Sequence, residues 1–133
     1  MRTVFADTYY FLALLDTREA RHLQASEAAL DPQIHLVTTE WVLVEFGIAY
    51  SQPKDRADFV KICRSLPNNP RIKVIMSDPR LFQHGLDLYA RRKDKEWSMT
   101  DCISFVVMEE MGLREALTGD RHFEQAGFKA LLA

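Results

Sequence analysis

The chain has 133 residues, 47% of them hydrophobic and 27% charged, and its formal net charge is −2 at pH 7. This size and balance predict one globular domain, residues 1–133, with its own core, and so small a net charge excludes a general attraction to nucleic acid. No apolar run approaches the roughly 20 residues of a membrane span, and the acid at position 7 argues against a signal peptide. We therefore expect a soluble, cytoplasmic protein with no membrane partner.

The first third of the chain alternates strand-like and helix-like segments. RTVFA (2–6) predicts a strand that leads directly into a helix, TYYFLALLD (8–16). REARHLQASEAAL (18–30) predicts a second helix, which ends before Asp31-Pro32 because proline prevents its continuation. IHLVT (34–38) predicts the next strand.

The middle of the chain repeats this alternation. TEWVLVEFGIAYS (39–51) and DRADFVKICRSL (55–66) predict helices on either side of Pro53. RIKVIM (71–76) predicts a strand. Ser77-Asp78-Pro79 then supplies a cap and a first-turn proline for the helix RLFQHGLDLYARR (80–92).

The last third completes the pattern. MTDCISFVVMEEM (99–111) predicts a helix that Gly112 ends. EALT (115–118), a short helical turn from Asp120 and FKALL (128–132) follow. Alternation of this kind predicts an α/β/α sandwich with a mostly parallel central sheet.

Two acids follow predicted strands directly. Asp7 comes after RTVFA, and Asp120 comes after EALT and Gly119. Ligands of parallel sheets collect at the carboxyl ends of the strands, where both carboxylates should lie. Aspartate is also a favoured helix N-cap, and for either residue taken alone capping is the preferred explanation.

Two further acids lie on predicted helices. Glu45 has only apolar residues three and four positions away, and Asp101 heads an otherwise apolar helix. Ser98-x-x-Asp101 also fits a capping box, which explains the second acid without any chemistry. Neither acid has a Lys or Arg three or four positions away, so each needs a distant basic partner, a raised pKa or a shared cation.

A divalent cation would relieve the repulsion among Asp7, Glu45, Asp101 and Asp120 if they converge on one edge of the sheet. Oxygen ligands favour Mg²⁺, with Mn²⁺ as a substitute, over zinc. A cation held in this way activates water and neutralises charge on a phosphodiester. The sequence therefore predicts phosphodiester hydrolysis.

The segments around these acids resemble those of PIN-domain ribonucleases, and within that superfamily the VapC-type toxins of bacterial toxin-antitoxin pairs. The resemblance covers nearly the whole chain and depends on "VFADTYYFLALLD", "TTEWVLVEF", "MTDCISFVVMEEMG" and "ALTGDRHFEQAGF". It implies that Asp7, Glu45 and Asp101 bind the metal, directly or through water, and that Asp120 completes the cluster or holds a second metal. It also implies endonucleolytic cleavage of RNA, a homodimer, and an antitoxin protein that blocks the active site.

Residues of two kinds surround the predicted acids. Hydroxyl groups that could orient carboxylates or water belong to Thr8, Thr100, Ser104 and Thr118; helix capping or back-bonding explains them equally well. The candidate RNA contacts are Arg91, Arg92, Lys93, Lys95, Trp97, Arg121 and His122, and a merely solvated loop is the alternative for the basic run.

Two other functions fit an α/β domain with acids at its strand ends. One is a receiver-like phosphoacceptor, which is disfavoured because "FADTYY" lacks an acidic pair and "LTGDRH" lacks a lysine. The other is a catalytically silent module that only binds RNA or protein. Metal-dependent cleavage would separate the enzyme from the silent module.

Overall fold

Strand β1 (Arg2–Ala6) runs through the middle of a five-stranded sheet in which every strand pairing is parallel. The computed structural model describes residues 1–133, with the strands in the order β3-β2-β1-β4-β5. Phe5 pairs with Val37 on one side and with Ala116 on the other. The remaining strands are β2 (Ile34–Thr39), β3 (Ile72–Ile75), β4 (Glu115–Leu117) and β5 (Lys129–Ala130).

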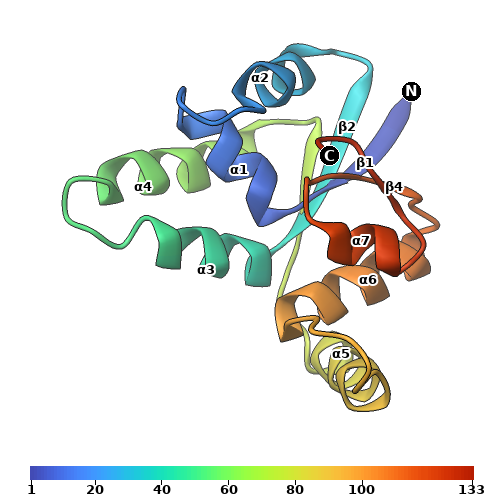
Figure 1. The fold of residues 1–133 in the computed structure, drawn as a ribbon. Helices are drawn as coiled ribbons and strands as arrows, with labels where there is room; N and C mark the ends of the chain where they lie inside the picture. Colours follow the sequence, from blue (N-terminus) through green and yellow to red (C-terminus); the bar gives the residue numbers. More distant parts are fainter.

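Helices cover both faces of this sheet (Figure 1). The connections that carry α1 to α4 lead from β1 to β2 and β3, whereas the connection that carries α5 and α6 leads back across the sheet to β4. Because parallel crossovers are right-handed, these opposite directions place the two helix groups on opposite faces. The predicted α/β/α sandwich is confirmed, and its sheet is wholly parallel. No helix combines the length and hydrophobicity that a membrane span requires. The helices are α1 (Thr8–Leu15), α2 (His22–Leu30), α3 (Glu40–Ala49), α4 (Arg56–Ser65), the 3₁₀ helix η1 (Leu66–Asn68), α5 (Pro79–Arg91), α6 (Met99–Met111) and α7 (Arg121–Gln125).

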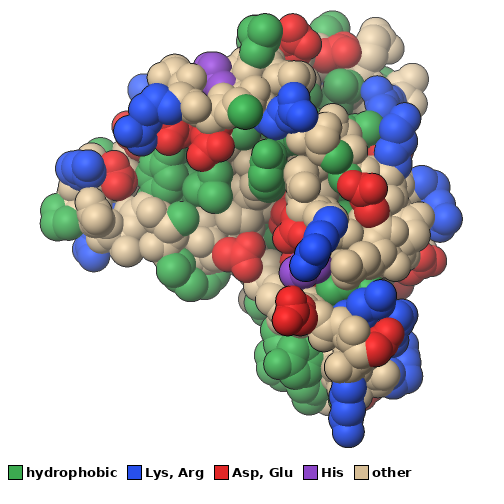
Figure 2. Space-filling model, viewed as in Figure 1, with side chains coloured by type: hydrophobic (Ala, Val, Ile, Leu, Met, Phe, Trp, Pro, Cys, Tyr) green, Lys and Arg blue, Asp and Glu red, His purple; other side chains and the backbone are tan.

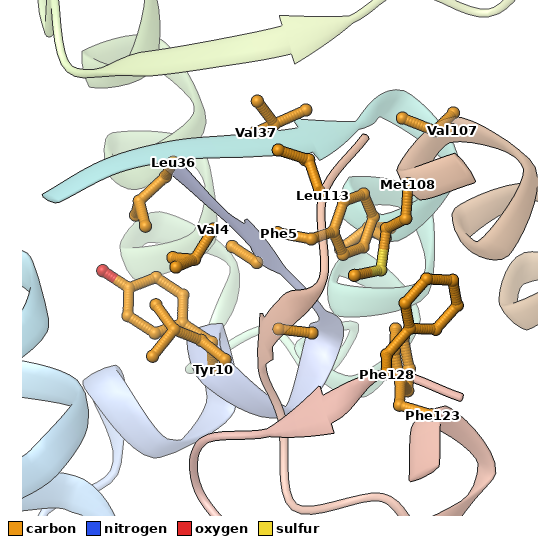
Figure 3. Close-up of a cluster of buried hydrophobic side chains, with 14 of the residues drawn as sticks. Val4, Phe5, Tyr10, Leu36, Val37, Val107, Met108, Leu113, Phe123 and Phe128 are labelled. Carbon is orange, nitrogen blue, oxygen red and sulfur yellow. The ribbon is translucent and has the colours of Figure 1, made fainter. Parts of the chain in front are cut away.

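The hydrophobic core lies on both faces of β1. Val4 and Phe5 are completely buried, and successive side chains of a strand point to opposite faces. Figure 3 shows Val4 on the side of Tyr10, and Phe5 on the side of Met108 and Phe123. The rings of Phe5 and Phe123 lie 6.3 Å apart between centroids. Burial on both faces explains why this strand is apolar without alternation.

Local capping explains where several helices begin and end. Asp78 caps α5 through the Arg80 amide, with Pro79 in the first turn, and Gly112 ends α6 with a left-handed φ of 67°, as predicted. The helix predicted from residue 18 is wrong at its start, because α2 begins only at His22. Asp16 accepts hydrogen bonds from the amide and the guanidinium of Arg18, which holds these residues in a turn.

The carboxyl ends of β1, β2 and β4 meet at one edge of the sheet because the three strands are parallel. Asp7 follows β1, and Thr118 follows β4. The next residue, Gly119, passes so close to α1 that an added Cβ would lie 2.6 Å from Cζ of Tyr9. A side chain at this position would meet the end of the Tyr9 side chain, so either that ring or the backbone around Gly119 would have to shift.

Candidate metal centre

Asp7 is the most deeply buried acid at this edge, with 5% of its surface exposed. It stands at the N-cap position of α1 but makes no capping hydrogen bond. Instead, its Oδ2 accepts a hydrogen bond of 2.9 Å from the hydroxyl of Thr118. The capping explanation of Asp7 therefore fails, and its carboxylate faces into the edge of the sheet.

The surroundings of Asp7 raise its pKa from 3.8 to about 7. Burial is the main cause, and the hydrogen bond from Thr118 and the nearby Thr8 amide oppose it. The negative charges of Asp101 and Glu45 raise the pKa further, so both lie close enough to Asp7 to repel its carboxylate. Ionising Asp7 beside these two acids is therefore costly in free energy unless a cation is present.

Glu45 joins this group from α3. The side chain is half-buried, and its Oε1 accepts a hydrogen bond from the hydroxyl of Thr8, the first residue of α1. Thr39 caps α3 by accepting a hydrogen bond from the Val42 amide, which fixes the start of the helix. Thr8 and Thr118 thus each bind one carboxylate, as expected of residues that orient metal ligands.

Asp101 lies at the start of α6 and is buried. The predicted capping box is present: Asp101 Oδ2 accepts from the Ser98 amide at 3.1 Å, and the Asp101 amide donates to Ser98 Oγ at 3.0 Å. The same Oδ2 lies 3.0 Å from Nδ1 of His122. The cap therefore uses one carboxylate oxygen and leaves Oδ1 for another partner.

Asp120 is a helix cap in this structure. Its Oδ1 accepts a hydrogen bond of 2.9 Å from the His122 amide, and its own amide donates to the Thr118 hydroxyl at 3.0 Å. The same Oδ1 lies 3.5 Å from Nδ1 of His122. One ligand atom each of Asp101, Asp120 and His122 lie within 4.8 Å of one another, a spacing that suits a metal ion.

Three of the acids are thus connected by shared contacts, and Glu45 is bonded to Thr8, the neighbour of Asp7. Thr118 bonds to both Asp7 and Asp120, and His122 contacts both Asp120 and Asp101. The donors are mainly carboxylate oxygens with one imidazole, a set that fits Mg²⁺ or Mn²⁺.

The other two predicted hydroxyl groups, those of Ser104 and Thr100, do not bond to the acids. Ser104, one turn after Asp101 on α6, is completely buried, and its hydroxyl has no hydrogen-bond partner. An unpaired buried hydroxyl beside carboxylates suits a centre that an ion or water completes. Thr100 is half-buried near the start of α6 and takes no part in the network.

The predicted RNA contacts are divided among three places. Lys95, Arg121 and His122 line a polar cleft of about 290 Å³ together with Asp94, Glu96 and Gln125. Since His122 also touches Asp101, this cleft adjoins the acids. Figure 2 shows acidic, basic and histidine side chains together between α3 and α7.

The other members of the basic run lie apart from the acids. Arg91 lines a cavity between α5 and α6, and Lys93 lines a separate cavity with Lys95. Arg92 forms an ion pair with Asp94 and lies over the Trp97 ring, 4.8 Å from its centroid.

Trp97 is 5% exposed. Its indole nitrogen donates to Gln125, and its ring packs edge to face with Phe105. The guanidinium of Arg92 lies over the ring as well, so little of the indole is open to solvent. Trp97 is therefore poorly placed to stack on a base in this structure, and its contact with RNA stays a prediction.

Sequence reasoning assigned His122 to RNA phosphates and did not foresee its contact with Asp101. The two residues are 21 positions apart, so no local pattern connects them. One local signal was available. Asp120 caps α7 and His122 follows two residues later, so both side chains lie near the start of this helix, at the carboxyl edge of the sheet.

Comparisons with known proteins agree with this fold. The PIN domain family model matches residues 4–129. The chain is 27% identical over 131 residues to the 23S rRNA-specific endonuclease VapC20 of Mycobacterium tuberculosis, covering 94% of this chain and 95% of that protein. The crystal structure of M. tuberculosis VapC20, described as a Sarcin-Ricin loop cleaving toxin, is similar with a TM-score of 0.85 at 24% identity, over 98% of this chain and 99% of that one. VapBC2 from Rickettsia felis, bound to a DNA fragment from its promoter, is similar with a TM-score of 0.67 at 13% identity, over 98% and 97% of the two chains.

Proposed function

The chain belongs to the PIN domain family, and from this premise we propose that it is a metal-dependent endoribonuclease, the VapC-like toxin of a toxin-antitoxin pair. The observation that carries the proposal is the environment of Asp7. This acid is buried beside Asp101 and Glu45 at the carboxyl edge of a parallel sheet and caps no helix. Ionising this buried carboxylate beside two other acids destabilises the folded chain, and a bound cation would offset that loss.

Asp7, Glu45 and Asp101 would hold Mg²⁺ or Mn²⁺, with Asp120 completing the set. When bound, the cation supplies an activated water and neutralises charge on the scissile phosphate. Thr118 orients the Asp7 carboxylate by donating to Oδ2, and Thr8 does the same for Glu45.

The substrate we propose is structured RNA, with ribosomal RNA as the first candidate because the VapC20 relative is specific for 23S rRNA. Lys95 and Arg121 line the polar cleft next to the acids, where they would hold phosphates that flank the scissile bond. Asp94, in the same cleft, is neutralised by a bidentate pair with Arg92, so it opposes an approaching phosphate less.

The partners we propose are an antitoxin protein and a second copy of the chain. The antitoxin is suggested by similarity to a VapBC pair. For the homodimer, α5 offers Phe82, Leu86 and Tyr89, which share one helix face and are 44%, 40% and 48% exposed. Figure 2 shows hydrophobic side chains gathered beside α5, as expected of an uncovered interface.

The test is cleavage of a pool of structured RNAs, ribosomal RNA included, by the purified protein with Mg²⁺, with Mn²⁺ or with chelator. Asp101→Asn should abolish cleavage, because it removes a ligand charge and keeps an oxygen for the cap. Asp87→Asn, on the exposed surface of α5, is the matched control and should cleave normally.

Binding of RNA without metal-dependent cleavage would support the catalytically silent module instead. Cleavage that survives both the chelator and Asp101→Asn would contradict the proposed mechanism. The receiver-like alternative is set aside because the chain belongs to the PIN domain family.

A further inference from the structure

His122 lies between two of the acids. Its Nδ1 is 3.0 Å from Asp101 Oδ2 and 3.5 Å from Asp120 Oδ1. The ring is 21% exposed, so it is partly shielded from solvent. No Lys or Arg forms an ion pair with either acid. His122 is therefore the only group of possible positive charge that contacts them.

The spacing of these three atoms suits a shared cation. Two ligands at about 2.1 Å from a metal and at right angles to each other lie about 3.0 Å apart. The distances from Nδ1 to the two carboxylate oxygens, 3.0 and 3.5 Å, are close to this value. All three ligand atoms lie within 4.8 Å of one another, so little movement is needed for them to meet one ion.

Contacts within the chain hold each of the three side chains independently of a metal. The Ser98 amide holds Asp101 Oδ2, and the His122 amide holds Asp120 Oδ1. The imidazole is in turn held by its contact with Asp101, whose Oδ2 lies 3.0 Å from Nδ1. A ligand group that is fixed in advance binds with little loss of conformational entropy.

We propose that His122 supplies Nδ1 as a ligand to a divalent cation between Asp101 and Asp120, and that the centre therefore prefers Mn²⁺ to Mg²⁺. Imidazole nitrogen suits transition metals, whereas Mg²⁺ prefers oxygen ligands. Ligation through Nδ1 places the imidazole proton on Nε2, on the other side of the ring. The inference rests on the proposed function for the existence of a metal centre, but not on RNA cleavage.

The test is metal binding to the intact protein without RNA. Titration calorimetry with Mn²⁺ and with Mg²⁺ should show tighter binding of Mn²⁺. In His122→Ala, the Kd for Mn²⁺ should rise on the order of tenfold, and the Kd for Mg²⁺ should change by less than about threefold. Pulsed EPR of the Mn²⁺ complex should show coupling to an imidazole ¹⁴N in the wild type and none in His122→Ala.

Two variants separate ligation from hydrogen bonding. His122→Asn keeps a side-chain donor that can reach Asp101, so it should preserve the fold but not the nitrogen coupling. His84→Ala removes an exposed histidine whose partner is Glu110 and should change neither affinity nor coupling. Circular dichroism of each variant checks that it is folded.

A Mn²⁺ complex of the wild type without nitrogen coupling would overturn the inference, and so would equal losses of Mn²⁺ and Mg²⁺ affinity in His122→Ala. RNA cleavage without nitrogen coupling would count against this inference alone. Nitrogen coupling without cleavage would count against the proposed function alone.

Discussion

The two halves of the acid cluster are built differently. Asp7 and Glu45 are held by threonine hydroxyls and cap no helix, whereas Asp101 and Asp120 each cap one and share contacts with His122. In the second half, capping alone would explain why an acid is present. In the first half it does not, so the case for a bound cation is strongest there.

The largest expected effect lies in the half that caps nothing. Asp7→Asn should lower RNA cleavage on the order of 10³-fold, because it removes the buried charge that would face the metal. Asp120→Asn should cost less, about tenfold, because Asp120 lies nearer the rim. The comparison is measured by kcat/KM on one RNA. Equal losses of kcat/KM in the two variants would mean that both halves of the cluster contribute equally to cleavage.

A second difference concerns how the stability of the folded chain depends on pH, because the pKa of Asp7 is raised. Since burial raises the pKa of Asp7 from 3.8 to about 7, the folded chain retains a proton that the unfolded chain has lost between these values. The free energy of unfolding, measured in chelator, should therefore fall as pH rises from about 4 to about 7, by roughly 4 kcal/mol at most. Asp7→Asn should remove this contribution.

Urea unfolding at about pH 5 and about pH 8 gives the measurement. The asparagine variant should be the more stable protein at the higher pH in chelator, and added Mn²⁺ should reverse the order. A wild type whose stability does not change with pH would contradict the raised pKa.

Substituting the threonines that bond to Asp7 and Glu45 tests the first half of the cluster separately. Thr118→Val removes the donor to Asp7, in a buried bond, and the acceptor of the Asp120 amide, in a half-buried one. It should cost about 1–3 kcal/mol of unfolding free energy. Thr8→Val removes one bond to half-buried Glu45 and should cost about 1 kcal/mol or less. Thermal unfolding of both variants in chelator would show whether this order holds.

The smallest expected effect separates capping from metal binding at Asp120. Asp120→Ser keeps a capping oxygen, so the free energy of unfolding should change by less than about 0.5 kcal/mol, whereas Asp120→Ala should lose about 1 kcal/mol. If Asp120 is also a ligand, both variants should weaken Mn²⁺ binding. Unchanged Mn²⁺ affinity in Asp120→Ser would leave Asp120 as a cap only.

The fold was predictable because its signals are local. The apolar segment at β1, the proline in the first turn of α5 and the left-handed Gly112 each act within a few residues. The prediction failed at the start of α2, where the turn at Asp16 competes with a helix-favouring composition. That competition depends on side-chain hydrogen bonds, which periodicity does not report.

The candidate site was predictable in its acids but not in their contacts. The position of Asp7 after a strand and the apolar neighbours of Glu45 both pointed to the edge of the sheet. The burial of Trp97 and the contact of His122 with Asp101 depend on how α7 packs against the loop before α6. Such contacts join residues that are distant in sequence, so one sequence alone does not reveal them.

The bond between Thr118 and Asp7 has a consequence for synthesis of the chain. It joins residues 111 positions apart, and the strands that carry them pair only when β4 has been made. During translation, therefore, Asp7 leaves the ribosome early, whereas Thr118 becomes available to bond to it only when nearly all of these residues have emerged. The acid cluster is among the last contacts that the nascent chain can close, because Asp101, Thr118 and Asp120 all lie in its last third.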